Sequence, residues 1–155
     1  MNKAAVFFVG IGGIGMSGLA QYFLSQGHAV AGYDRLLTPL TQKLASLGAQ
    51  ISDVDAPTAI PTLFRDPKNT KVIYTPAVPA KSPVLTYFKD NGFKLAKRAA
   101  VIGEISHTMP CLAVAGTHGK TTTSALLTHL LRTCGKKITA FLGGIAADIL
   151  SLIHI

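Results

Sequence analysis

Residues 5–15 read AVFFVGIGGIG, an apolar run followed at once by a cluster of glycines. The run Ala5–Val9 has the length and the β-branched and aromatic content of a buried strand. Gly10, Gly12 and Gly15 form a G-x-G-x-x-G pattern, and apolar residues then recur at helical spacing as far as Gly27. This pattern predicts a helix from near Gly12 to Gly27, with Gly27 as its C-terminal cap. Strand, glycine turn and helix in this order open a βαβ unit.

The same alternation of apolar runs and amphipathic stretches continues along the chain. Further strands are expected near residues 29–33, 50–52, 72–75 and 93–97, and helices near 38–48, 82–92 and 99–105. Residues 53–71 are rich in turn-forming residues, so we expect a loop there with one short helix near 59–64. The sequence therefore predicts an α/β fold, a Rossmann-like parallel sheet with flanking helices, over residues 1–107.

The composition fits a folded protein with an anionic partner. Hydrophobic residues make up 48% of the sequence and charged residues 14%, which is enough apolar material for a core. The net charge is +8, but the basic residues are scattered, and the longest adjacent pairs are Lys97-Arg98 and Lys136-Lys137. A nucleic-acid binder would instead carry a basic stripe with interleaved aromatic residues. We therefore expect a small phosphorylated ligand and no nucleic acid.

The apolar segments and the two cysteines indicate the compartment. No apolar segment is both long and free of glycine, so we expect no membrane span and a cytoplasmic location. Cys111 and Cys134 lie far apart inside apolar stretches and lack metal-binding spacing. We interpret both as buried thiols in a reducing compartment.

The first glycine loop has the features of a nucleotide-binding turn. In such a turn the first glycine permits the tight bend, the second lets the backbone approach a pyrophosphate, and the third lets helix and strand pack closely. Asp34 follows the second expected strand, about 20 residues further on, where an acid usually bonds a ribose hydroxyl or the base of a nucleotide. The alternative is a glycine-rich turn that only packs a helix, with Asp34 a solvated residue at a strand end.

A second glycine loop lies at residues 115–122, AGTHGKTT. Its end, Gly119-Lys120-Thr121, matches the end of a Walker A box, in which loop N–H groups hold phosphates, the lysine reaches the β and γ oxygens and the hydroxyl ligates magnesium. Its front is shorter, because the nearest glycine is Gly116. Expected strands at 112–115 and 138–142 and an expected helix at 121–134 surround it. We therefore expect the first β-P-loop-α-β unit of a second, ATPase domain over residues 108–155, after a joint at 107–110.

With both loops considered, the sequence resembles the Mur ligases of bacterial peptidoglycan synthesis. Residues 116–121 match the compact loop G-T-x-G-K-T of that family. The stretches at 8–18, 32–34, 75–78, 97–99 and 141–144 are similar to the branch that joins L-alanine to UDP-N-acetylmuramate, so the resemblance covers nearly the whole chain. The branch that recycles murein tripeptide onto the same UDP-sugar shares the second loop and stays an alternative. A non-catalytic nucleotide-binding module and an NAD-linked oxidoreductase are further alternatives.

The resemblance implies roles for the first loop and its surroundings. The glycines that would face the diphosphate of UDP-N-acetylmuramate are Gly10, Gly12, Gly13 and Gly15. Asp34 would meet the uracil. The residues that would line the rest of this pocket are Thr75, Pro76, Ala77 and Val78.

ATP and Mg²⁺ are the cofactors that the resemblance implies, and the second loop would hold them. The residues implied in ATP binding are Gly116, Thr117, His118, Gly119, Lys120, Thr121 and Thr122. Within this set Lys120 would act as the catalytic residue on the β and γ phosphates, and Thr121 would ligate Mg²⁺. For His118, contact with a phosphate and a space-filling role stay equally open.

The implied reaction transfers the ATP γ-phosphoryl group to the lactyl carboxylate of UDP-N-acetylmuramate, and the amine of L-alanine then attacks the acyl phosphate. Later motifs of the family's central domain and its C-terminal domain are not recognised here, and residues 150–155 do not resemble the family's continuation. We therefore expect the chain as given to bind the UDP-sugar but to lack ligase activity. The segment from residue 108 onward is expected to dock on the first domain, to associate with another copy, or to be poorly ordered.

Overall fold

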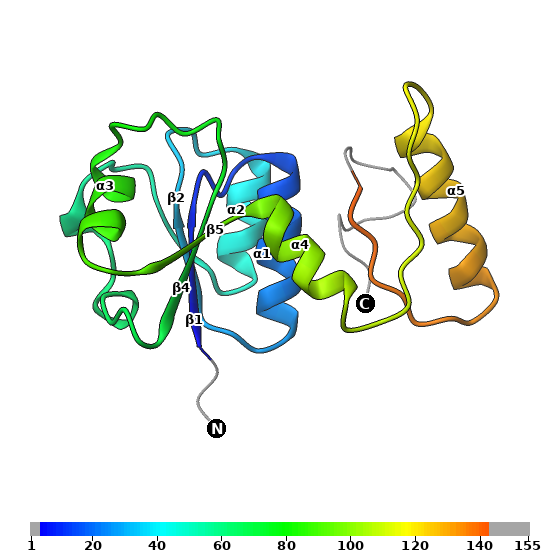
Figure 1. Cartoon of the computed structure of the whole chain (residues 1–155), viewed down its shortest axis with the longest axis horizontal. Coiled ribbons are helices and arrows are strands. Elements are labelled where there is room, and N and C mark those ends of the chain that lie inside the picture. Colours follow the sequence, from blue (N-terminus) through cyan, green and yellow to red (C-terminus); the bar gives the residue numbers. More distant parts are fainter. Residues whose placement is uncertain (1–3, 143–155) are drawn as a thin grey trace.

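A five-stranded parallel sheet forms the centre of the first domain (Figure 1), as seen in a computed structural model that describes residues 4–142. The strands are β1 (Ala5–Val9), β2 (Val30–Tyr33), β3 (Gln50–Ser52), β4 (Thr70–Tyr74) and β5 (Lys94–Lys97). Their order is β3-β2-β1-β4-β5, and all neighbours are parallel. From β1, the chain first adds β2 and β3 on one side of this strand. It then adds β4 and β5 on the other side of β1. The strand order thus reverses between β1 and β4, and open α/β sheets bind their ligands outside the carboxyl ends of the strands at such a point.

Helices cover both faces of the sheet. Figure 1 shows α1 (Ile14–Ser25), α2 (Pro39–Ser46) and α4 (Arg98–Ser106) on one face, and α3 (Pro83–Asp90) on the other. Two short 3₁₀ turns, Pro57–Ala59 and Thr62–Phe64, lie along the chain between β3 and β4. Alternate residues of β1 enter opposite cores, because side chains alternate across a strand. Val6 and Phe8 pack with α1, α2 and α4, whereas Phe7 and Val9 pack with α3 and Phe64.

The α/β class and its parallel sheet are confirmed. Apart from the short helix expected near 59–64, each strand and helix expected up to residue 106 is present, with its bounds shifted by at most two residues. Side chains cap two of these helices: Thr38 and Thr41 form a reciprocal capping box at α2, and the Ser82 hydroxyl accepts from the Leu85 N–H at α3. The expected single helix at 59–64 was wrong, because the two 3₁₀ turns occupy this region instead.

Two expected strands beside the second loop are not formed. Residues 112–115 and 138–142 have no strand hydrogen bonding, although the helix between them is present as α5 (Lys120–Thr133). A helix satisfies its backbone groups internally, whereas a strand needs a neighbour, and no partner strand for these segments lies within residues 4–142. The expected burial of Cys111 and Cys134 was wrong for a related reason. Both thiols are exposed, because residues 4–142 form no second layer over this part of the chain.

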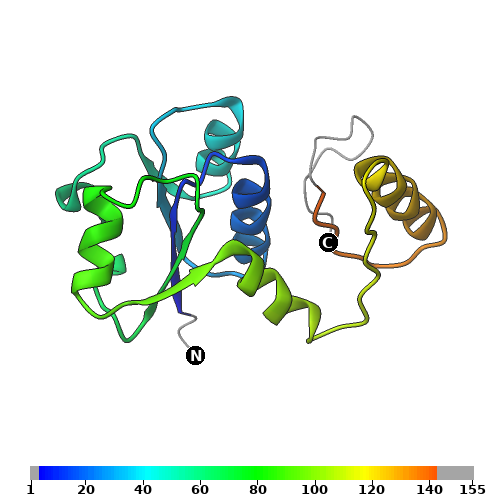
Figure 2. The same cartoon turned by 45° about the horizontal axis from the view of Figure 1, so that its top comes forward.

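The last described residues return to the first domain, while α5 does not. The Phe141 ring lies 6.0 Å from the Tyr22 ring of α1, centroid to centroid, and Leu142 is buried. Figure 2 shows α5 standing apart from the sheet, as does Figure 1. On α5, Leu126 and Leu130 are 62% and 61% exposed. The expectations for residues 143–144 and 150–155 lie outside the described residues. Between residues 4 and 142, no helix combines the length and apolar character needed to cross a bilayer.

Candidate functional site

The first glycine loop turns the chain sharply at the carboxyl end of β1. The N–H groups of Gly10 and Ile11 both donate to the Tyr33 carbonyl oxygen, at 2.8 and 3.1 Å. Gly10 has a φ of +89°, and a Cβ there would lie 2.6 Å from the Thr75 Cγ2 and 2.9 Å from a Val78 methyl group. Only glycine fits such a position. The expected role of the first glycine in a tight turn is therefore confirmed, and Thr75 and Val78 lie directly beside it.

The second glycine makes room for a carboxylate. The Gly12 N–H donates to Asp34 Oδ2 at 2.7 Å, and a Cβ on Gly12 would come within 2.9 Å of that same oxygen. The other oxygen, Oδ1, accepts from the Leu36 N–H at 3.2 Å. The structure thus brings Asp34 to the loop, as the sequence predicts. It also shows that Asp34 fastens the loop to the turn after β2, a role that the spacing argument did not include.

The start of α1 presents free backbone donors. Gly13 is the N-cap residue in an extended conformation (φ −64°, ψ 143°), and no side chain caps the helix. The first N–H groups of a helix have no intrahelical acceptor, so those of Ile14 and Gly15 face outward with the positive end of the helix dipole. A Cβ on Gly13 would meet only the Gly10 carbonyl oxygen at 3.8 Å and Met16 at 4.0 Å. The mouth of the loop is therefore open, with the character of an anion site.

The third glycine lies against a cation. A Cβ on Gly15 would overlap the guanidinium group of Arg98, the first residue of α4. The expected role of this glycine, close packing of helix on strand, is thus replaced by contact with an arginine. From the sequence, Arg98 stood out only as one of an adjacent basic pair and within the stretch 97–99 that resembles the family, with no role assigned to it. Its position directly after β5 could have indicated it, since the carboxyl ends of parallel strands share one edge.

A partly buried polar cluster lies at the same edge of the sheet. Asp55 Oδ1 accepts from the Ser82 hydroxyl at 2.8 Å and from the Val84 N–H at 3.0 Å, at the start of α3. The Tyr33 hydroxyl, at the end of β2, also bonds Asp55. Burial raises the pKa of Tyr33, and the charge and hydrogen bond of Asp55 raise it further. Asp55 lies in the segment expected to be loop, and no sequence pattern marked it.

The second loop is formed as a turn into α5. Gly119 is its N-cap residue with a φ of +76°, and Gly116 has a φ of +153°. Lys120 folds back on the loop, since its Nζ donates to the carbonyl oxygens of Gly116 at 2.6 Å and Thr117 at 3.0 Å. Thr121 lies in the first turn of α5 and the whole loop is exposed. The ammonium group is therefore held over the loop by two backbone carbonyl oxygens.

Comparison with known proteins identifies the family. The sequence model of the Mur ligase family, catalytic domain, matches residues 5–109. The chain belongs to the Mur ligase family. The UDP-N-acetylmuramate--L-alanine ligases of Christiangramia forsetii and Parabacteroides distasonis are 49% and 52% identical to it over 146 residues. In each case the match covers 94% of this chain and 32% of the relative, so the chain spans about a third of the length of these curated relatives.

Solved Mur ligases share the fold. The UDP-N-acetylmuramate-alanine ligase of Thermotoga maritima superposes with a TM-score of 0.86 at 32% identity, over 97% of this chain and 34% of that one. The UDP-N-acetylmuramate:L-alanyl-gamma-D-glutamyl-meso-diaminopimelate ligase of Neisseria meningitides has the same TM-score at 24% identity, over 97% of this chain and 46% of that one. The second comparison concerns the fold alone.

Within this Mur ligase chain, the expected site residues form two separate groups. The first loop, Asp34 and the Thr75–Val78 turn meet at one edge of the sheet. The second loop lies with α5, which both Figure 1 and Figure 2 show apart from the sheet. The structure thus assembles the first group and leaves the second outside it. The ligand contacts expected of both groups stay predictions.

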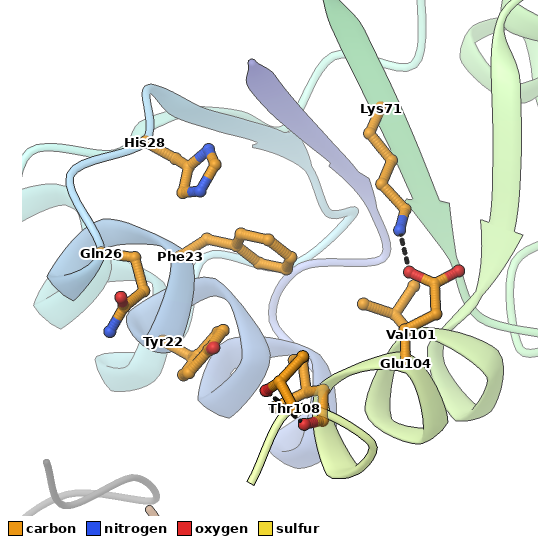
Figure 3. A pocket seen from close by; sticks show the side chains of 9 residues that line it. Tyr22, Phe23, Gln26, His28, Lys71, Val101, Glu104 and Thr108 are labelled. Carbon is orange, nitrogen blue, oxygen red and sulfur yellow. Dashed lines mark hydrogen bonds and ion pairs between the residues drawn. The ribbon is translucent and has the colours of Figure 1, made fainter. Parts of the chain in front are cut away.

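A cavity of about 270 Å³ lies at the opposite end of the sheet, between α1 and α4. Figure 3 shows Lys71 paired with Glu104 on one side and Phe23 and His28 on the other. The His28 Nδ1–H donates to the Ala4 carbonyl oxygen at 2.7 Å. None of the residues expected to bind a ligand lines this cavity. It is therefore distinct from the glycine-loop site.

Proposed function

We propose that this chain is the N-terminal part of an ATP-dependent ligase that joins L-alanine to UDP-N-acetylmuramate in peptidoglycan synthesis. The proposal assigns residues 1–107 to the UDP-sugar-binding domain and residues 108–155 to the start of the central ATP-binding domain. The observation that carries it is the first glycine loop, which presents the uncapped start of α1 at the carboxyl end of β1, where the strand order reverses. Relatives of that name, 49–52% identical over nearly the whole chain, support this choice of substrate. The cytoplasmic location expected from the sequence belongs to the same proposal.

In this proposal the first loop holds the diphosphate of the UDP-sugar. The N–H groups of Gly13, Ile14 and Gly15 are the donors, because Gly10 and Gly12 already donate to Tyr33 and Asp34. Asp34 turns toward the uracil and keeps accepting from Gly12. The turn residues that line the pocket beside Gly10 are Thr75, Pro76 and Ala77.

The second loop is proposed to bind ATP and Mg²⁺. ATP supplies the phosphoryl group that activates the substrate carboxylate. Lys120 exchanges its two carbonyl partners for phosphate oxygens, and the Thr121 hydroxyl offers one hard oxygen ligand of the kind Mg²⁺ prefers. Among the described residues there is no group of three or more metal-binding side chains. In a coupled phosphate-release assay with ATP, UDP-N-acetylmuramate and L-alanine, we expect no ligase turnover from this chain alone.

Calorimetry with three ligands tests the proposal. The 155-residue chain is titrated with UDP-N-acetylmuramate, with NAD⁺ and with ATP. We expect binding of the UDP-sugar and none of NAD⁺. Tight binding of NAD⁺ in its place would instead support the oxidoreductase alternative.

The variant Gly13→Ala locates the site. A methyl group there meets only ordinary contacts at 3.8 and 4.0 Å, and the φ of −64° suits alanine, so folding is unaffected. The methyl group stands at the mouth of the loop, and we expect it to weaken UDP-sugar binding about 10-fold or more. Lys120→Ala is the matched control, since it changes the other loop and leaves UDP-sugar binding intact. Equal affinities of wild type and Gly13→Ala would place the UDP-sugar elsewhere.

A further inference from the structure

Arg98 places a positive charge directly over the first turn of α1. Its guanidinium group occupies the space that a Cβ on Gly15 would fill, and α4 packs beside α1. The residue is solvent-exposed, so its side chain has room to extend away into water. It lies instead at the helix start, where the outward-facing N–H groups already carry partial positive charge.

This arrangement lacks a compensating anion. The Arg98 side chain makes no ion pair or hydrogen bond with another residue between 4 and 142. The acids of neighbouring elements are engaged elsewhere: Asp34 accepts from backbone N–H groups, and Glu104 pairs with Lys71. A guanidinium and a helix N-terminus repel each other weakly when nothing lies between them. A bound dianionic group would be stabilised by both.

We propose that Arg98 is a substrate-binding residue that contacts the diphosphate of the UDP-sugar, together with the N–H groups at the start of α1. This inference rests on the proposed function of the first loop and adds a side chain to its backbone donors. The planar guanidinium can donate two parallel hydrogen bonds to phosphate oxygens, which suits a diphosphate better than an uncharged ribose. It also explains why residue 15 is a glycine, because any side chain there would displace the arginine.

The test compares four forms of the full 155-residue chain: wild type, Arg98→Gln, Arg98→Lys and Lys94→Gln. Lys94 is the matched control because it is exposed and begins β5, at the edge of the sheet opposite the loop. The dissociation constant for UDP-N-acetylmuramate is measured at low and high salt, and the melting temperature is measured without ligand. Both measurements are made on the same preparations.

We expect Arg98→Gln to weaken binding about 10- to 100-fold, with a smaller dependence on salt. Arg98→Lys should fall between this variant and wild type, and Lys94→Gln should stay within about twofold of wild type. Without ligand, the melting temperature of Arg98→Gln should equal or exceed that of wild type. The reason is that the substitution removes a positive charge from beside the positive end of the α1 dipole. A purely structural arginine would instead lower the melting temperature when removed.

Three results would overturn the inference. Wild-type affinity in Arg98→Gln would refute the role of Arg98 and leave the proposed function standing. Weaker binding together with a lower melting temperature of the free variant would assign the residue a structural role. Failure of wild type to bind the UDP-sugar at all would refute the proposed function of this chain, and the inference with it.

Discussion

At the residue scale, Asp34 shows how a spacing argument can be correct and incomplete. The carboxylate lies at the glycine loop because β1 and β2 are neighbours whose carboxyl ends share an edge. That much follows from the sequence. Its bonds to the N–H groups of Gly12 and Leu36 do not, because they depend on the path of two turns.

Asp34→Ala should lower the free energy of unfolding by about 1–3 kcal/mol, because two backbone N–H groups lose a charged acceptor. Urea unfolding monitored by circular dichroism measures the change. Asp53→Ala is the control, since Asp53 is exposed and has no side-chain hydrogen bond with the described residues; it should change stability by less than about 0.5 kcal/mol. Similar losses in both variants would show that the Asp34 bonds contribute little.

Tyr33 makes the stability of the chain depend on alkaline pH. Its pKa is raised in the folded chain by burial and by Asp55, so the unfolded chain loses the phenolic proton first. The contribution of Tyr33 is therefore fully present below the ordinary tyrosine value of about 10 and is lost as the pH rises through the higher folded pKa. Tyr33→Phe should be about 1 kcal/mol less stable at pH 7 through loss of the hydrogen bond.

The stability difference between wild type and Tyr33→Phe should shrink above pH 10. Urea unfolding at several pH values between 7 and about 11.5 measures it. A stability difference that stays constant over this pH range would contradict the assignment of the raised pKa of Tyr33 to burial and Asp55.

Arg98 marks the limit of sequence reasoning at this scale. Its contact joins the first residue of α4 to the second residue of α1, across an intervening strand. No local sequence pattern predicts such a contact. The edge at which it occurs was nevertheless predictable from the parallel order of strands.

At the scale of elements, local signals determined most of the architecture. Caps such as Thr38 and Ser82 and the glycines after α1, α2 and α3 delimit helices by interactions within a few residues. The prediction of strands at 112–115 and 138–142 was wrong because a strand depends on a partner strand that is not local in sequence. An apolar run can indicate an extended segment, but it cannot supply the neighbouring strand that makes it part of a sheet.

The strand-to-helix turn after β1 offers a quantitative test. Gly10→Ala combines a positive φ of +89° with a clash against Thr75 and Val78, whereas Gly48→Ala has a φ of +100° and nothing within 4 Å of the added Cβ. Both should lose about 1–2 kcal/mol of stability from backbone strain, and Gly10→Ala about 1–3 kcal/mol more from overpacking. Equal losses in urea unfolding would mean that Thr75 and Val78 move aside without cost.

At the scale of the whole molecule, the two parts of the chain differ in how they are held. The sheet is covered on both faces by packed helices, whereas α5 leaves Leu126 and Leu130 exposed. Of the three outcomes expected for the later segment, docking on the first domain agrees with the contact between Phe141 and Tyr22. Association between copies stays a prediction, which sedimentation velocity at several concentrations would test.

Hydrogen exchange should separate the two parts. Amides of β1 and β4 should be the most protected, and those of α5 should exchange about as fast as in an isolated helix, because few buried contacts oppose its opening. Mass spectrometry of peptides from α1 and α5 in one sample provides an internal comparison. Equal protection of the two helices would show that α5 has a covering layer, formed by a second copy or by residues outside the described range.

The bond between Gly12 and Asp34 also bears on the kinetics of recognition. Because that carboxylate fixes the loop as the chain folds, the loop loses its conformational entropy then and not when a ligand arrives. A ligand meets a rigid surface, so encounter requires no slow rearrangement, and differences in affinity between ligands should appear mainly in how long each one stays. The carboxylate at the end of β2 thus lowers the entropy cost of binding by ordering the loop beforehand, apart from any contact of its own.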